Sequence, residues 1–245
     1  MKENLHAIIL AGGKGTRMKS ELPKCAYPFN GKPMVSYIID ACKQAGIEDI
    51  VVIVGYKYET LVSLLPNDVK WVRQEEQLGT AHAAKCAYPL LKDKDGLTLI
   101  FPGDMPLIDA TTIKNIVSYH MNHNNQLTDV SIVLDDPAAF GRIYRENGKI
   151  KKIIEFKDCT EEQKRIKEIN IGLFCVDNKL LFSSLDKIKN KNNAKEFYLT
   201  DIVEVMLEKY KVDAYIAPTD YRFIGVNSVD ELKALEEEYL NHFRG

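Results

Sequence analysis

The sequence has few of the features that mark secreted, membrane or metal-ribbon proteins. It contains 5 cysteines, and no two stand close together. This excludes the paired spacing of zinc ribbons and redox motifs and predicts free thiols in a reducing compartment. No apolar run reaches the roughly 18 residues that a membrane span needs. The N-terminal segment also lacks the long apolar core of a signal peptide. We therefore expect a cytoplasmic protein with no membrane partner.

An excess of charge of one sign is also missing. Lys and Arg total 33 while Asp and Glu total 35, so the net charge is −2. There is no general positive charge to attract nucleic acid, and any cationic site must be local. Repeats, long linkers and low-complexity tracts are absent, including the hexapeptide repeat of a β-helix. With 245 residues the chain can bury a large core, and we expect one domain over 1–245.

What is present in the first half is an alternation of short β-branched runs with helical patterns. This alternation predicts a doubly wound α/β fold with a mostly parallel sheet, in which ligands bind beyond the carboxyl ends of the strands. The predicted strands are 7–10, 50–54, 69–72, 97–101 and 130–134, and the predicted helices are 34–44, 59–65, 81–91 and 111–123.

The pattern changes after Pro137. Asn147-Gly148 between two short apolar runs predicts a tight hairpin within 142–156, which we expect to form a lid or a substrate-binding lobe. The remaining predicted elements are a helix start at 160–163, a strand at 169–176, a helix at 199–209, a strand at 212–216 and a closing helix at 229–243.

The most informative segment runs from an apolar strand into a glycine-rich turn, Leu10-Ala11-Gly12-Gly13-Lys14-Gly15-Thr16-Arg17-Met18, with Pro23-Lys24 shortly after it. Glycines let successive backbone N–H groups approach phosphate oxygens, and Lys14, Arg17 and Lys24 supply positive charge. The spacing fits neither the dinucleotide fingerprint nor the P-loop. A plain structural turn is the alternative, but the cations favour a site for a nucleotide triphosphate.

Two oxygen-bearing side chains are candidate ligands for a hard dication such as Mg²⁺. Asp104 directly follows a predicted strand, where the ligands of such a sheet bind, and Asn227 offers a side-chain carbonyl. Each has a structural alternative, because Asp104 suits a turn or a helix cap and Asn227 suits the cap of the closing helix.

A second glycine turn follows the predicted strand 69–72, in Gln74-Glu-Glu-Gln-Leu-Gly79-Thr80-Ala-His82. The carboxamide of Gln74 can donate and accept together, which suits the edge of a pyrimidine such as uracil. The backbone at Gly79 and Thr80 can approach a ring closely. His82 is expected to cap or pack.

In the second half, Gly141, Glu155 and Asn170 stand in segments with the neutral and anionic groups that sugar hydroxyls need, and with an amide for an N-acetyl group. Taken singly, such residues are exposed and have no specific function in most proteins. Asp201 is expected to be structural, as a polar residue in the first turn of a helix.

Together these motifs resemble the uridyltransferase domain of bacterial bifunctional N-acetylglucosamine-1-phosphate uridyltransferases, which are sugar nucleotidyltransferases. The resemblance covers nearly the whole chain. It is carried, in order, by 10–18, 22–24, 31–34, 76–83, 103–104, 141–148, 168–170, 198–201 and 225–227. The bifunctional proteins continue into a β-helix acetyltransferase domain, whereas this sequence stops at Gly245, so no acetyltransferase activity is expected.

The resemblance implies a Rossmann-like nucleotidyltransferase fold with an inserted sugar-binding hairpin lobe. The nucleotide-binding half would be 1–136, the sugar-binding half 137–227 and the C-terminal helix 228–243. The implied reaction joins UTP and N-acetylglucosamine-1-phosphate, with Mg²⁺, into UDP-N-acetylglucosamine and pyrophosphate. Another sugar-1-phosphate or nucleotide (glucose-1-phosphate, dTTP or CTP) and a non-catalytic nucleotide-sugar-binding module stay open as alternatives, as does the oligomeric state.

The resemblance also implies a role for each motif residue. Uridine would be held by Leu10, Ala11, Gly12, Gly13, Gln74, Gly79 and Thr80, and the phosphates by Arg17 and Lys24; Mg²⁺ would be held by Asp104 and Asn227, and the N-acetylglucosamine moiety by Gly141, Glu155 and Asn170.

Overall fold

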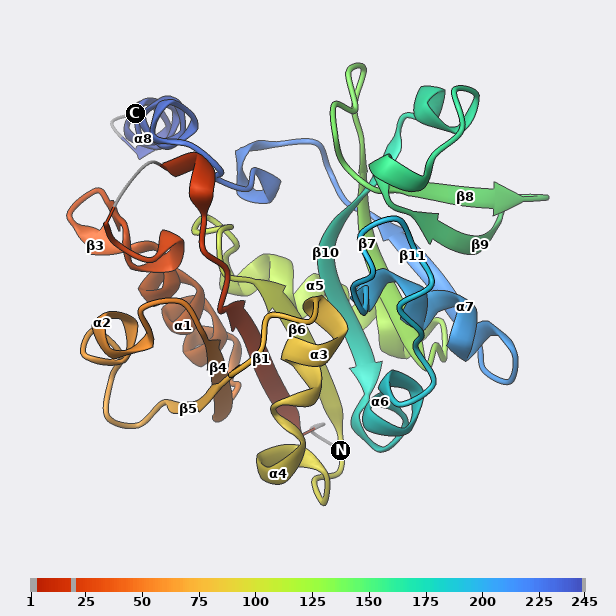
Figure 1. The fold of residues 1–245 in the computed structure, drawn as a ribbon, viewed down its shortest axis with the longest axis horizontal. Coiled ribbons are helices and arrows are strands. Elements are labelled where there is room, and N and C mark those ends of the chain that lie inside the picture. Colours follow the sequence, from red (N-terminus) through yellow and green to blue (C-terminus); the bar gives the residue numbers. More distant parts are fainter. Residues whose placement is uncertain (1–3, 19–20, 244–245) are drawn as a thin grey trace.

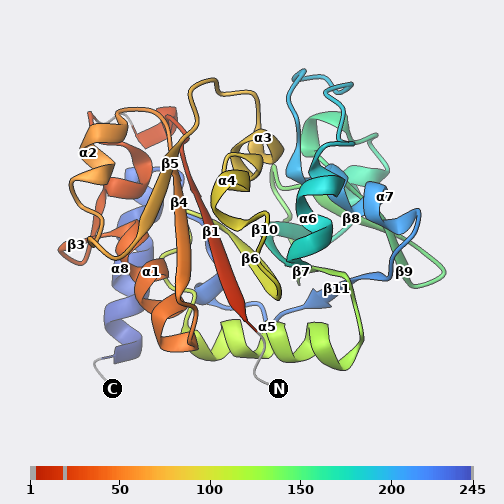
Figure 2. The ribbon, with the colours of Figure 1, turned by 90° about the horizontal axis from the view of Figure 1, so that it is seen from below.

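The computed structural model describes residues 4–18 and 21–243, and a twisted sheet with helices on both of its faces forms its centre (Figure 1, Figure 2). The strand order along this sheet is β11-β7-β10-β6-β1-β4-β5. The strands are Leu5–Ala11 (β1), Asp49–Val54 (β4), Lys70–Arg73 (β5), Leu97–Pro102 (β6), Leu127–Val133 (β7), Glu168–Asp177 (β10) and Val212–Ile216 (β11).

Strand β10 alone runs against its neighbours in this path. It pairs antiparallel with both β6 and β7. All the other pairs are parallel, namely β1 with β4 and β6, β4 with β5, and β7 with β11. The predicted doubly wound, mostly parallel α/β fold is therefore confirmed, and two strands from the second half of the chain, β10 and β11, join the strands of the first half in this sheet.

The sheet is buried on both faces, which explains why its central strands are apolar throughout. Ile9 of β1 packs in one hydrophobic cluster with Ile38 and Ile116, from the helices α1 (Met34–Ala45) and α5 (Ala110–Asn122). Ile8 points the other way, into a cluster with Ala84 and Leu181, from α3 (Thr80–Lys85) and α6 (Asn178–Leu185). Alternate residues of one strand thus anchor both helical layers.

A third cluster joins the two ends of the chain. Phe29, from the small β2–β3 hairpin, packs with Val226 and Leu235 around the closing helix α8. The bounds are Pro28–Phe29 (β2), Lys32–Pro33 (β3) and Val229–Phe243 (α8). This packing brings the segment after the glycine-rich turn next to the segment before α8.

The predicted hairpin forms as expected. Arg142–Glu146 (β8) and Lys149–Ile154 (β9) pair antiparallel across Asn147 and Gly148, whose φ angles are 50° and 76°. Two positive φ angles are what an Asn-Gly turn between strands requires. The hairpin joins the main sheet where Arg142 pairs with Ile169 of β10.

The helices differ from prediction in three places. The predicted helix 81–91 is two short helices, α3 and Tyr88–Leu91 (α4), because Pro89 has no N–H to continue the ladder. At 160–163 the reciprocal Thr160 and Gln163 bonds of a capping box form, but only a 3-10 turn, Gln163–Arg165, follows before β10 begins. Helix α6 was not predicted.

The remaining helices are Tyr58–Val62 (α2) and Ile202–Leu207 (α7). Within residues 4–18 and 21–243, every helix is too short or too polar to span a bilayer.

Candidate active site

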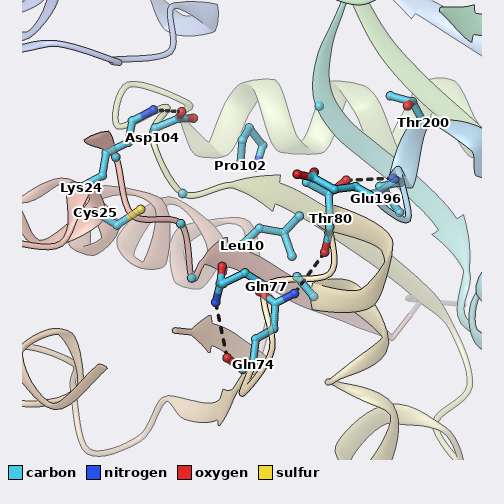
Figure 3. Close-up of a pocket in the computed structure, with 18 of the residues that line it drawn as sticks. Leu10, Lys24, Cys25, Gln74, Gln77, Thr80, Pro102, Asp104, Glu196 and Thr200 are labelled. Atoms are coloured by element: carbon cyan, nitrogen blue, oxygen red, sulfur yellow. Dashed lines mark hydrogen bonds and ion pairs between the residues drawn. The ribbon is translucent and has the colours of Figure 1, made fainter. Parts of the chain in front are cut away.

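A cavity of about 540 Å³ lies at the carboxyl ends of β1 and β6 (Figure 3). It brings together most of the site residues that the sequence predicts: Leu10, Gly12, Gly13, Arg17, Lys24, Gln74, Gly79, Thr80, Asp104, Glu155, Asn170 and Asn227. Ala11 and Gly141 are not among its lining residues; Ala11 is buried at the end of β1, and Gly141 lies behind the wall.

At one side of the cavity, segments that are distant in sequence meet around two cations. The Lys24 ammonium donates to Asp104 Oδ2 at 2.5 Å and to Asn227 Oδ1 at 2.8 Å. Arg17 donates to the same Asn227 oxygen at 2.8 Å. The backbone N–H of Val226 donates to the Asp104 carbonyl at 2.9 Å and so fixes the approach of the two oxygen-bearing residues.

The donor set of Asp104 and Asn227 fits a hard dication. One ammonium touches both oxygens, so the carboxylate and the carboxamide converge on a single cation-sized position. Magnesium takes one or two protein oxygens and completes its shell with water and phosphate oxygens. The described residues contain no group of three or more His, Cys, Asp or Glu that could hold a metal.

Gly15 allows the glycine-rich turn to lie directly against Lys24. Its φ is +60°, and a Cβ at this position would stand 2.6 Å from the Lys24 Cβ. Only glycine tolerates both the backbone angle and this approach. The turn and the lysine are thus packed as one unit.

On another side of the cavity, Gln74 is held in one orientation although it is only 4% exposed. Its Nε2 lies 3.1 Å from the Gly79 carbonyl and 3.0 Å from His82 Nδ1. A carbonyl can only accept, so the amide nitrogen must face Gly79, and His82 Nδ1 then accepts the second hydrogen. None of the described residues donates to Gln74 Oε1, which is left to accept from a ligand.

Gly79 holds the loop that carries these contacts. Its φ is +118°, and a Cβ there would lie 2.5 Å from the Phe197 carbonyl oxygen. That oxygen accepts from the N–H of Ala81 at 2.9 Å, so the loop lies flat against the segment before α7. A larger residue at position 79 would separate the two walls.

The third side of the cavity is acidic and polar. Thr200 donates to Glu155 Oε1 at 2.9 Å, and burial raises the pKa of the Glu155 carboxyl. Gly141 lies behind this side, because a Cβ there would be 3.6 Å from Glu155 Oε2. The Gly141 carbonyl accepts from the N–H of Asn170 at 2.9 Å. Gly141 thus supports Glu155 and Asn170 from outside the lining.

Comparison with known proteins decides the family. Residues 6–238 match the Nucleotidyl transferase family. The chain belongs to this family. The match spans both halves of this nucleotidyl transferase, including the hairpin and most of α8.

Bacterial relatives of this nucleotidyl transferase are closely similar in sequence. It is 42% identical over 240 residues to the bifunctional protein GlmU of Acholeplasma laidlawii, a match that covers 96% of this chain and 52% of the relative. It is 44% identical over 224 residues to GlmU of a Geobacillus species, covering 91% and 49%. The chain spans about half the length of the curated relatives it matches.

Solved structures share the fold of this nucleotidyl transferase at lower identity. A UDP-glucose pyrophosphorylase complexed with UDP-glucose superposes with a TM-score of 0.77 at 19% identity, covering 98% of this chain and 100% of the other. A putative glucose-1-phosphate thymidylyltransferase from Bacillus anthracis gives 0.75 at 21% identity, covering 96% and 94%.

The cavity of this nucleotidyl transferase also contains lining residues to which the sequence analysis assigned no role, among them Gln77, Pro102, Glu196 and Thr200. Thr200 was foreseeable, since it stands in the 198–201 motif that carries the resemblance. The contact of His82 with Gln74 was not expected, because a histidine early in a helix packs or caps more often than it orients a neighbour.

Asp201, which was expected to be structural, supplies a pH-dependent prediction. Burial, then the negative charges of Glu204 and Glu155, raise its pKa from 3.8 to about 6. The folded chain therefore binds a proton more tightly than the unfolded chain, and stability falls as pH rises from about 4 to about 6. We expect Asp201→Asn to raise the free energy of unfolding at pH 8 by about 1 kcal/mol. This is less than the full pKa shift corresponds to, because solvent screens the charges.

Thermal melts across pH test this prediction. The Asp201→Asn variant and the native chain should melt together below about pH 4, where the native carboxyl is protonated in both states. Asp93→Asn, at an exposed position, is the control and should melt like the native chain throughout. A variant that is no more stable than the native chain at pH 8 would contradict the prediction.

Proposed function

We propose that this nucleotidyl transferase moves the uridylyl group of UTP onto N-acetylglucosamine-1-phosphate, with Mg²⁺, and releases pyrophosphate. The observation that carries the proposal is that one cavity has three sides lined by different chemical groups. Lys24 and Asp104 lie at one side, Gln74 at another, and Glu196 and Thr200 at a third (Figure 3). The similarity to bifunctional GlmU proteins supports the same reaction.

The phosphate side suits a reaction between two anions. An oxygen of the sugar phosphate would attack the α-phosphorus of UTP while the bond to the bridging oxygen of the β-phosphate breaks. No protein nucleophile is required, so the chain must align the reactants and offset their charge. Backbone N–H groups of the glycine-rich turn would hold phosphate oxygens, and Arg17 and Lys24 would offset the charge that builds on the α-phosphate.

Asp104 and Asn227 would hold the Mg²⁺. When bound, the ion would act as a Lewis acid that neutralises part of the phosphate charge. The approach of both oxygens to one ammonium supports this role.

The nucleotide side supports a choice among bases. With its nitrogen committed to Gly79 and His82, Gln74 offers an oxygen that accepts. Uracil and thymine carry an N–H donor at ring position 3, whereas cytosine carries an acceptor there. Gln74 would therefore favour UTP and dTTP over CTP.

Gln74→Glu tests the base site. The new carboxylate would face the Gly79 carbonyl, so we expect the KM for UTP to rise about 30-fold, which corresponds to about 2 kcal/mol. The KM for the sugar phosphate should stay unchanged. Gln44→Glu, on the exposed side of α1, is a matched control and should leave both values alone. An unaltered KM for UTP in the Gln74→Glu variant would remove this residue from the site.

Pyrophosphate release from UTP and N-acetylglucosamine-1-phosphate tests the proposal as a whole. Parallel reactions would replace the sugar by glucose-1-phosphate, or UTP by dTTP or CTP, or withhold Mg²⁺ with a chelator. Fastest release from UTP with the N-acetylated sugar, and none in the chelated sample, is the expected result. Faster turnover of another pair would change the substrate assignment. Tight binding of UDP-sugar without turnover of any pair would point to a non-catalytic module.

A further inference from the structure

Beneath the acidic side of the cavity lies a carboxylic acid that none of the roles above uses. Asp129, on β7, is fully buried, and it is the only Asp or Glu in the buried set of residues 4–18 and 21–243. It forms no ion pair with any residue that the structure describes. The nearby Arg145 donates instead to both oxygens of Glu168, at 2.7 Å each. Burying an acid without a neighbouring cation costs free energy. Such a residue is therefore expected to have a specific role toward a neighbouring group.

The hydrogen-bond partner of Asp129 is Asn170, the cavity residue proposed for the sugar. The Asn170 amide nitrogen donates to Asp129 Oδ1, and Asn170 Oδ1 accepts from the N–H of Gly172 at 2.9 Å. Both ends of the carboxamide are thereby fixed. Turning it over would place its NH₂ group against the Gly172 N–H, which can only donate. One N–H and one carbonyl lone pair of Asn170 remain for a ligand.

The backbone around Asp129 and Asn170 is irregular, because the pairing of β7 with β10 is interrupted there. Asp129 and Ser131, two positions apart on β7, face Phe174 and Asn170, which are four positions apart on β10. The ladder is broken between them, and Gly172 takes a φ of +79° there. Such a bulge re-aims side chains and leaves ladder positions unpaired. Asp129 lies at this break, directly behind Asn170.

The second oxygen of Asp129, Oδ2, is buried without a hydrogen-bond partner among the described residues. Burial raises the pKa of this carboxyl well above its usual range. A hydrogen bond from the backbone N–H of Val130 lowers the pKa of the Asp129 carboxyl, but burial outweighs it. An apolar residue would fill the same space without an unpartnered oxygen, and the contacts with Asn170 and Val130 are what distinguish the acid from it.

We propose that Asp129 is a positioning residue for the sugar phosphate: from beneath the cavity it fixes the Asn170 carboxamide so that one donor and one acceptor face the ligand. The inference rests on the proposed function, because it assumes that Asn170 contacts the sugar. It assigns Asp129 no contact with either substrate.

Steady-state kinetics of substitutions at position 129 test this proposal. Asp129→Leu removes the acceptor while filling similar space. We expect the KM for N-acetylglucosamine-1-phosphate to rise about tenfold, with the KM for UTP and kcat within about twofold, since a binding contact common to ground state and transition state is lost. Asp129→Asn keeps an acceptor oxygen for Asn170 and should restore the native KM. If the leucine variant does not fold, Asp129→Ser, whose shorter hydroxyl falls short of Asn170, takes its place.

Two controls separate the possible failures. Thr128→Val, one position away on β7, removes a buried hydroxyl that contacts His120 and Asn125, and should lower the melting temperature without altering either KM. Asn170→Ala should raise the sugar-phosphate KM at least as much as Asp129→Leu. If Asn170→Ala raises it and the position-129 variants do not, the positioning role is overturned while the proposed function stands. If Asn170→Ala leaves it unchanged, or the native chain does not turn over this sugar, the proposed sugar site fails and this inference with it.

Discussion

Asp104→Asn should lower the turnover number about a thousandfold, the largest effect expected of any single substitution in this chain. The change removes a carboxylate that touches the Lys24 ammonium and weakens the proposed magnesium position. It keeps the shape of the side chain and the backbone contact between Asp104 and Val226. Because the Asp104 side chain is 24% exposed at the end of a strand, the fold should be unaffected.

Pyrophosphate release measures this effect, and a thermal melt checks that the variant is folded. Asp109→Asn is a matched control five positions further on. Asp109 caps α5 by accepting from the N–H of Thr112, a role that asparagine also performs. The Asp109→Asn variant should therefore retain full activity. A turnover number for Asp104→Asn within about threefold of the native value would exclude Asp104 from the reaction.

Lys24→Met should be the second most damaging change, with turnover reduced about a hundredfold. Methionine matches the length of the lysine stem, so the packing against Gly15 is kept while the charge is lost. Without the ammonium, Asp104 and Asn227 lose the cation that joins them, and Arg17 keeps its contact with Asn227. Both substrates are anions, so the loss should fall on kcat more than on the affinity for either one.

The control for this charge removal is Lys32→Met. Lys32 pairs with Asp40 on the surface, and its side chain is 41% exposed, so its replacement should leave turnover unchanged. If the two methionine variants showed equal rates, Lys24 would be an ordinary surface lysine and the phosphate side of the cavity would need another explanation.

The parallel strands β1, β4 and β6 were predictable because they are buried on both faces and read as short, largely apolar runs. The hairpin was predictable because Asn147-Gly148 suits only a few backbone conformations. Local sequence patterns gave a wrong prediction where a later segment of the chain determines the secondary structure. The capping bonds of Thr160 and Gln163 form, yet the chain leaves the helical path after Arg165 to enter β10. Pro89, which interrupts helical hydrogen bonds, divides the predicted helix 81–91 into two.

That most of the motif residues line one cavity was predictable from sequence, because side chains suited to phosphates, a metal and a base are expected to act together. Supporting residues were not. Asp129 stands just before the predicted strand 130–134, and nothing in the sequence distinguishes a buried acid from one in a loop. The contact of His82 with Gln74 depends on how a loop folds over Phe197, which no local pattern encodes.

The place of β10 has a consequence for biosynthesis. Because β10 lies between β6 and β7, those two strands have no contact with each other in the sheet until residues 168–177 arrive. A nascent chain that has emerged only as far as β7 would carry two open strand edges, the kind of surface that pairs with other chains. We therefore expect the first half not to fold when it is excised, and we expect ribosomal pausing before β10 to favour aggregation.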